Sequence, residues 1–196
     1  MEIESLDVAM MSALARYRLG FDPAMEPMSL RDWEKGDLPL LEASMGDPEM
    51  TRYLGGPESG EQIASRHARY VALAGTGTGH MLVILAGPDH EPVGSVGYWE
   101  KEWNGELIFE MGWSVLPAYQ GRGIAAQATT IALDRARSEG KHRYVHAFPS
   151  VENAASNAIC RKVGFTLLGA ADFEYPKGHA MRCNDWRFDL VRPLAR

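Results

Sequence analysis

A turn with two glycines, Gln120–Ala125 (QGRGIA), constrains the fold of this chain more than any other segment. It follows a predicted strand and precedes a predicted helix. The glycines let the backbone turn tightly and leave its N–H groups unobstructed. The helix adds its unpaired N-terminal N–H groups and the positive end of its dipole. The turn is therefore a candidate site for an anion such as pyrophosphate.

The segments around this turn predict short strands and helices of a mixed domain. Three strands with short connections are expected before it: His80–Ala86, Pro92–Glu100 and Glu106–Leu116. Short connections imply antiparallel pairing. After it, helices are expected at residues 124–139 and 153–162, and strands at residues 144–148, 166–175 and 181–191. The expected fold class is α/β (α+β), a mixed central sheet with an antiparallel meander and flanking helices, and not a regular βαβ array.

The first part of the chain is predicted to be helical. From Leu30 the sequence indicates helical pieces broken by glycine and proline, and residues 60–74 show the spacing of an amphipathic helix. Residues 1–25 are rich in Met and Ala and are expected to form an N-terminal extension with a short helix. With 196 residues, the chain is expected to form one domain over residues 26–196.

Composition excludes several classes of function. The net charge of −6 comes without a basic stripe, so no nucleic-acid partner is expected. Cys160 and Cys183 are not in a paired spacing, and the six histidines are scattered, so no metal site is expected. The N-terminus lacks the basic region of a signal peptide, and no apolar run reaches membrane-spanning length. The cytoplasm is the expected location, with no membrane partner.

The segment from Asn153 to Phe165 has the pattern of a capped helix. Asn153 is a good N-cap, and Ser156 lies one turn later on the same face. Gly164 occupies the position where glycine ends a helix. An apolar stripe is expected on the opposite face, at Ala155, Ile159 and Val163. Cys160 is interpreted as a small packed residue.

Both segments resemble signatures of the GNAT N-acetyltransferase superfamily. Gln120–Ala125 is similar to its Gln/Arg-x-x-Gly-x-Gly/Ala motif. Asn153–Phe165 is similar to the N-x-x-S-N…K-x-G-F segment of the branch that acetylates the N-termini of ribosomal proteins. The likeness extends over roughly residues 30–190 of this sequence. It implies that acetyl-CoA is the cosubstrate and that acetyl passes directly to a primary amine in a ternary complex.

The resemblance also implies which residues bind the coenzyme. Backbone N–H groups of the glycine turn would hold the pyrophosphate, and the Arg122 side chain could add a charge beside it. The strand segment 113–115 would pair with the pantetheine arm, with one N–H near its start serving the oxyanion. The implied set is Trp113, Ser114, Val115, Gln120, Gly121, Arg122, Gly123, Ile124, Ala125 and Asn153.

Two residues are candidates for acid–base chemistry. Because an alkylammonium has a pKa of about 10, a base must remove its proton before attack on the thioester. Glu110 lies in the apolar strand LIFEMGWSV, where burial would raise its pKa and make it the candidate base. The alternative interpretation is that Glu110 is a charged residue of an edge strand and points to water. Ser156 is the candidate acid for the thiolate, or else an ordinary exposed helix serine. His146 is interpreted as structural.

Other functions are weighed against this one. GRGIAA also satisfies the dinucleotide fingerprint G-x-G-x-x-A, but Pro117–Gln120 separate the strand from the first glycine. Only about 70 residues follow, too few for a complete dinucleotide fold. A second alternative is an acetyl-CoA-binding sensor or docking module without turnover, against which the intact Glu110 argues. The amine acceptor stays open among protein N-termini, aminoglycosides, polyamines and amino acids. The C-terminal hairpin offers a surface for a homodimer.

Overall fold

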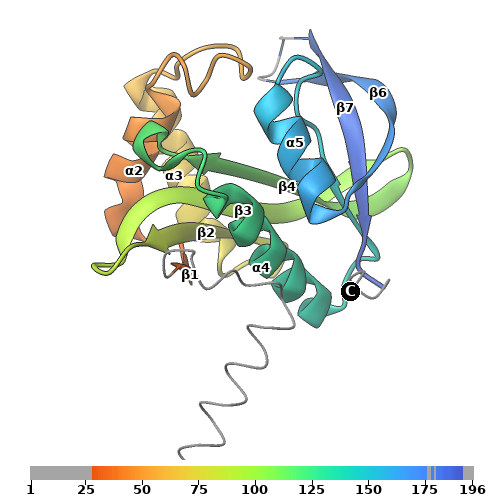
Figure 1. Ribbon diagram of the computed structural model, residues 1–196, viewed down its shortest axis with the longest axis horizontal. Coiled ribbons are helices and arrows are strands. Elements are labelled where there is room, and N and C mark those ends of the chain that lie inside the picture. Colours follow the sequence, from red (N-terminus) through yellow and green to blue (C-terminus); the bar gives the residue numbers. More distant parts are fainter. Residues whose placement is uncertain (1–27, 176–177, 179, 192–196) are drawn as a thin grey trace, which may run out of the picture.

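The computed structural model describes residues 28–175, 178 and 180–191. The extension expected at residues 1–25 lies outside the described residues. A seven-stranded sheet has the order β1-β2-β3-β4-β5-β7-β6 (Figure 1). Its strands are β1 Met28–Asp32, β2 Gly79–Ala86, β3 Glu91–Trp103, β4 Glu106–Val115, β5 Tyr144–Ala147, β6 Thr166–Glu174 and β7 Ala180–Asp189. The β4–β5 pair is parallel and the other pairs are antiparallel, which confirms the predicted mixed sheet with an antiparallel meander.

Helices cover both faces of the sheet. The α-helices are α2 Leu38–Met45, α3 Gly60–Leu73, α4 Ile124–Glu139 and α5 Ala154–Val163, and the 3₁₀ turns are η1 Lys35–Asp37 and η2 Pro117–Tyr119. One hydrophobic cluster joins α4 and α5 to the strands, and a second joins α2 and α3 to them. The longest helix in the described part of the chain, α4, has 16 residues. No helix there is long and apolar enough to cross a lipid bilayer.

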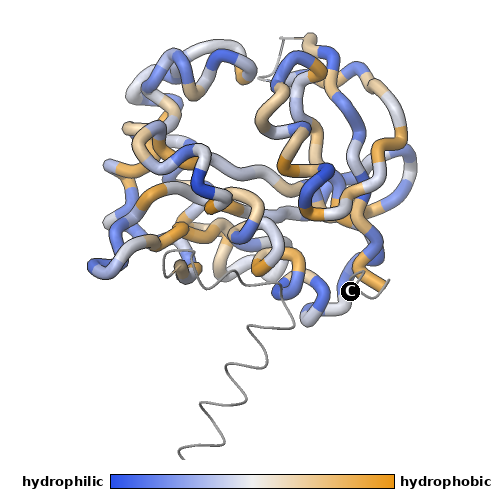
Figure 2. Tube along the Cα trace, viewed as in Figure 1, coloured by the Kyte–Doolittle hydropathy of each residue, from blue (hydrophilic) through white to orange (hydrophobic). Residues whose placement is uncertain are grey.

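Strand β2 shows how the two clusters share the sheet. Leu82 and Ile84 belong to the cluster under α4, whereas Met81 and Val83 belong to the cluster under α2 and α3. Successive side chains of a strand point to opposite faces, so a strand covered on both sides reads as a nearly continuous apolar run. Figure 2 shows this run in orange and the hydrophilic turn after it, residues 87–90, in blue.

The sequence-based expectation was wrong at the start of the domain. Residues from Leu30 were expected to be helical, but Met28–Asp32 form the edge strand β1, which pairs with β2 from Met28↔Ala86 to Asp32↔Leu82. The five-residue strand is stabilised by the edge of β2, whose paired residues lie 50 to 58 positions away along the chain. The spacing of neighbouring residues in the sequence does not indicate a pairing between segments so far apart.

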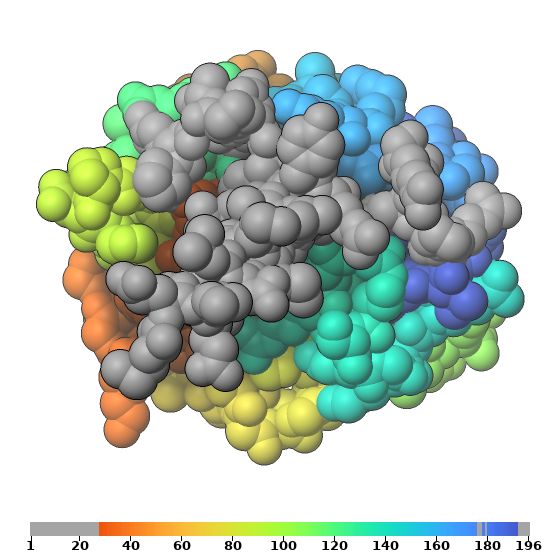
Figure 3. Space-filling view, turned by 60° about the horizontal axis from the view of Figure 1, so that its bottom comes forward, coloured from red at the N-terminus to blue at the C-terminus, as the bar shows by residue number. Residues whose placement is uncertain are grey.

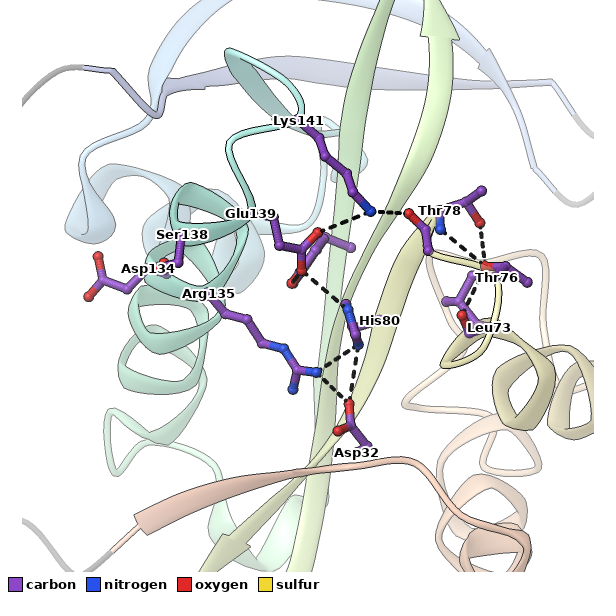
Figure 4. Close-up of polar contacts among 12 residues, drawn as sticks. Asp32, Leu73, Thr76, Thr78, His80, Asp134, Arg135, Ser138, Glu139 and Lys141 are labelled. Atoms are coloured by element: carbon purple, nitrogen blue, oxygen red, sulfur yellow. Dashed lines mark hydrogen bonds and ion pairs between the residues drawn. The ribbon is translucent and has the colours of Figure 1, made fainter.

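A polar cluster fastens α4 to the first strands of the sheet (Figure 4). His80 Nδ1 lies 3.2 Å from Asp32 Oδ1, and His80 Nε2 lies 3.2 Å from Glu139 Oε1. Arg135 completes the cluster through a 2.9 Å contact of Nη2 with Asp32 Oδ1. Tyr98 donates its hydroxyl to Glu139, and burial together with this carboxylate raises the pKa of the tyrosine.

The end of α4 is held from a second side. Lys141, just after the helix, donates to the backbone carbonyl of Gly77 in the α3–β2 connection. Figure 3 shows the two segments side by side at the surface, α4 in teal and the connection in yellow. These contacts hold the C-terminal end of α4 against the sheet and the connection before β2.

Candidate functional site

Strands β4 and β5 separate halfway along β4. Their parallel pairing covers only Phe109↔Val145 and Glu110↔His146, although β4 continues to Val115. The ends of both strands line one cavity with a volume of about 760 Å³, together with the glycine turn and α5. This volume lies within the range of small-molecule sites. Glu110 is the last β4 residue paired to β5 and lines the cavity.

The glycine turn requires its two glycines. Gly121 has φ +76° and Gly123 has φ +78°, in the left-handed region that most other residues avoid. Gly123 is the N-cap of α4, and Gly121, Gly123, Ile124 and Ala125 line the cavity. The first N–H groups of a helix have no partner within the helix. The turn therefore brings the positive end of α4 to the cavity wall, as an anion site requires.

The two polar side chains of the turn have structural contacts. Gln120 Nε2 donates to the Val115 carbonyl at 2.9 Å, which fastens the turn to the end of β4. Arg122 donates to the Ala118 carbonyl at 3.0 Å, and its guanidinium lies 5.3 Å from the ring centre of Tyr119. Gln120 lines the cavity, but Arg122 does not. The expected Arg122–phosphate contact thus requires another conformation of this exposed side chain.

Among the residues that the structure describes, the last three of β4 have no strand partner on the β5 side, where Gln120 engages the Val115 carbonyl. Trp113, Ser114 and Val115 pair with β3 on one side and line the cavity. The Ser114 hydroxyl is buried, and within the described chain it has no hydrogen-bond partner. Buried polar groups of native proteins nearly always have a partner, so an unpaired one beside a cavity fits a site that receives a polar ligand.

Helix α5 begins with the expected cap. Asn153 Oδ1 accepts the backbone N–H of Ser156 at 3.0 Å, and both residues line the cavity. The expected apolar stripe of Ala155, Ile159 and Val163 is divided between two surroundings, because Val163 packs against the core cluster under α4 and α5. The residues that α5 buries are Asn157 and Cys160, whereas Ala155 and Ile159 line the cavity.

Asn157 is a buried residue whose importance the sequence did not reveal. Its Nδ2 donates to the carbonyls of Ser150 and Asn153, at 2.9 and 2.8 Å. Its Oδ1 accepts from Asn184 Nδ2 at 2.7 Å and Trp186 Nε1 at 2.8 Å. One amide therefore joins the start of α5, the loop after β5 and strand β7, and holds the α5 side of the cavity in place.

Glu110 has a partner that was not expected. Lys101 Nζ lies 2.7 Å from Glu110 Oε2, and the Glu110 side chain is 17% exposed. The same ammonium lies 4.0 Å from the ring centre of Phe173, a cation–π distance. The base candidate is thus neither isolated among apolar groups nor fully solvated. It is a partly buried carboxylate held by an ion pair.

Lys101 was missed because the predicted strand ended too early. Residues 101–105 were interpreted as a turn, but β3 runs to Trp103 and the turn is Asn104–Gly105. Both turn residues have positive φ, +52° and +81°. Asn-Gly is the preferred pair for such a two-residue hairpin turn, so the sequence did contain the signal. The longer strand places Lys101 diagonally across from Glu110, on the same face.

Beyond Glu110 the cavity continues between the α2–α3 connection and the β6–β7 hairpin. Arg66 of α3 spans this end. It donates to both oxygens of Glu58, to Tyr70 Oη at 3.3 Å and to Tyr175 Oη at 2.5 Å. Burial is the largest single influence and lowers the pKa of the Arg66 guanidinium, but the hydrogen bond to Glu58 and the interactions with Tyr70 and Tyr175 together outweigh it and raise that pKa. Tyr175 is 109 positions from Arg66, so sequence spacing did not indicate the contact.

Neither cysteine is placed to act as a nucleophile. Cys160 is fully buried, and burial raises the pKa of its thiol to about 12. Cys183 is also fully buried, and its thiol pKa is raised to about 11. The thiolate is the reactive form, so both side chains are inert at neutral pH. His146 is buried as well, with Nδ1 2.6 Å from Asp185 Oδ1, which fits its structural interpretation.

Comparison with known proteins places this geometry in context. Residues 28–166 match the family model described as acetyltransferase (GNAT) domain, more than half of the chain. The acetyltransferase of Salmonella typhimurium that modifies the N-terminal serine of ribosomal protein L7/L12 is similar in structure, with TM-score 0.68 and 22% identity over 83% of this chain and 94% of that one. Spermidine N-acetyltransferase of Vibrio cholerae, solved with CoA and spermine, has TM-score 0.69 and 18% identity over 83% and 95%. At these identities the likeness shows a shared fold.

Proposed function

Because the chain belongs to the GNAT acetyltransferase family, we propose that it transfers the acetyl group of acetyl-CoA directly to a primary amine in a ternary complex. The observation that carries the proposal is a single cavity. Its lining includes the glycine turn at one end, Glu110 in the middle and the α2–α3 connection at the other. One cavity therefore has room for an anionic coenzyme and an amine on either side of a carboxylate.

The coenzyme would bind along the backbone. The N–H groups of residues 121–125 would hold the pyrophosphate at the start of α4. The edge of β4 at residues 113–115, which the separation of β5 leaves open, would pair with the amides of the pantetheine arm. The unpartnered Ser114 hydroxyl lies on this path, and Asn153 borders it from α5.

The reaction would then proceed at the point where β4 and β5 separate. Glu110 accepts a proton from the ammonium, directly or through water, and Lys101 keeps the carboxylate in position. The amine nitrogen forms a bond to the thioester carbonyl, and a backbone N–H near Trp113 or Ser114 stabilises the oxyanion. The C–S bond breaks, Ser156 gives a proton to the departing thiolate, and the second proton that the nitrogen loses as the amide forms returns to Ser156, directly or through water. A thiol pKa of about 8.5 makes that assistance modest.

The competing function is an acetyl-CoA-binding sensor or docking module of the same fold. Both functions predict acetyl-CoA binding, so binding alone does not separate them. The decisive experiment incubates the purified protein with acetyl-CoA and a panel of primary amines, and follows both free thiol release and acetylated product. Amine-dependent release supports the enzyme. Tight acetyl-CoA binding without product from any amine would favour the sensor.

A further inference from the structure

The acceptor end of the cavity is apolar and aromatic. We define it by six lining residues: Met50, Tyr53, Tyr70, Trp99, Phe173 and Tyr175. They come from the α2–α3 connection, from α3, from β3 and from the β6–β7 hairpin. A ligand that enters between them would meet ring faces and thioether groups over most of its surface.

Several polar groups of this wall are already engaged with one another. Arg66 is paired with Glu58 and donates to the hydroxyls of Tyr70 and Tyr175. Tyr70 is mostly buried, which raises the pKa of its hydroxyl and keeps it neutral. Glu110 is paired with Lys101, whose ammonium lies over Phe173. The rings therefore remain as the main surface offered to a ligand.

The charged side chains that line the cavity also limit how many positive charges a bound ligand can carry. Two acidic and two basic side chains line it: Glu49, Glu110, Arg66 and Lys162. Glu110 has Lys101 as its counter-ion, which leaves Glu49 as the one further lining carboxylate of the described chain, and Glu49 is exposed. A second or third ammonium placed against the aromatic wall would gain cation–π contact with the rings but no counter-ion, and the loss of its hydration costs more than that contact contributes.

We infer that the acceptor is a monoamine with an apolar or aromatic group close to its nitrogen, and not a polycation. This inference rests on the proposed function and narrows its substrate class. A free arylalkylamine has this chemistry, and so does a peptide whose first residue is apolar. In either case the nitrogen reaches Glu110 while the apolar group packs against the acceptor end.

Calorimetry on the CoA-saturated protein tests the inference independently of turnover. It compares 2-phenylethylamine with spermidine, and two peptides that differ only in Phe or Lys as first residue. Phenylethylamine or the Phe peptide should bind at least about tenfold more tightly than its cationic counterpart, because only the cation is desolvated without a partner. A preference between the two free amines identifies the acceptor as a small molecule, and a preference between the two peptides identifies it as a peptide N-terminus. Equal or tighter binding of the cations, or binding of none of the four ligands, would overturn the inference.

A matched pair of variants at Met50 tests the cause of the preference. Met50 is half-buried in the α2–α3 connection and lines the acceptor end. Met50→Glu supplies the missing carboxylate and should improve spermidine binding about tenfold, whereas Met50→Gln should not. Unchanged spermidine affinity in a folded Met50→Glu protein would contradict the charge argument. Thiol release with acetyl-CoA in the same mixtures tests the proposed function separately, since preferential binding without release would overturn only that proposal.

Discussion

The two ends of the cavity are lined by different kinds of chemical groups. The proposed coenzyme end, where the pyrophosphate and the pantetheine arm would bind, consists mainly of backbone groups: the first turn of α4, the edge of β4 beyond β5 and the capped start of α5. The acceptor end consists of side chains from the α2–α3 connection, α3, β3 and the β6–β7 hairpin, and Arg66 joins two of them, Tyr70 and Tyr175. The coenzyme end should therefore be sensitive to backbone conformation and added charge, and the acceptor end to single side chains.

The largest expected effect lies at Glu110, where the two ends meet. Glu110→Gln keeps the shape of the side chain and removes its basicity, so turnover should fall roughly 10²–10⁴-fold at neutral pH. The loss should shrink as the pH approaches the amine pKa of about 10, because free amine is then present without a base. Acetyl-CoA affinity should hardly change.

The measurement is a pH–rate profile of the wild type and the variant. Glu106→Gln, at the exposed start of the same strand, is the matched control and should keep the wild-type profile. If Glu110→Gln also keeps it, Glu110 is structural and another group takes the proton.

The next effect belongs to the coenzyme end alone. Gly123→Asn introduces a residue that tolerates the left-handed backbone better than most residues do. Gly123→Asp introduces a side chain of the same size that also carries a negative charge. The Asp variant should bind acetyl-CoA about 100-fold more weakly than the Asn variant, since facing like charges cost several kcal/mol. Calorimetry gives both affinities, and circular dichroism checks the fold. Equal affinities would place the pyrophosphate elsewhere.

Ser156 should have a smaller effect on the chemical step. Ser156→Ala removes the proposed proton donor but leaves the Asn153 cap, which uses the Ser156 backbone N–H. Single-turnover rates should fall about tenfold. The loss is smaller than for a reaction with a more basic leaving group, because a thiol with a pKa of about 8.5 leaves readily without an acid. Acetyl-CoA affinity should be retained. A wild-type rate would show that Ser156 is an ordinary helix residue.

The smallest effect is expected at the acceptor end. Tyr175→Phe removes one acceptor of Arg66 and leaves its bonds to Glu58 and Tyr70. A partly exposed hydrogen bond is worth about 1 kcal/mol, so KM for the amine should rise about two- to fivefold. KM for acetyl-CoA should stay the same. A change in the acetyl-CoA constant instead would mean that the two ends are not separable.

Much of the coenzyme end was predictable because its signals are local. Helix α4 begins and ends where predicted, since Gly123 and Gly140 both adopt left-handed φ at its ends. The α5 cap and the strand–turn–helix order likewise follow from neighbouring residues. The predicted fold class and GNAT family are confirmed.

The acceptor end was not predictable in the same way. The Arg66–Tyr175 contact joins residues 109 positions apart, and β1 exists because β2 offers it an edge. Neither contact has a signature in local spacing. The Glu110–Lys101 pair is an intermediate case: recognising Asn104–Gly105 as a hairpin turn would have extended β3 and placed the two side chains diagonally on one face.

The central claim is that one cavity holds both substrates at once and that acetyl passes directly between them. Initial rates measured over a matrix of acetyl-CoA and amine concentrations test it. A ternary complex predicts intersecting double-reciprocal lines, because both substrates must bind before any product leaves. Parallel lines would contradict it, since they require an acetylated protein as an intermediate. Cys160 and Cys183, buried and with thiol pKa values near 12 and 11, do not offer a nucleophile for one.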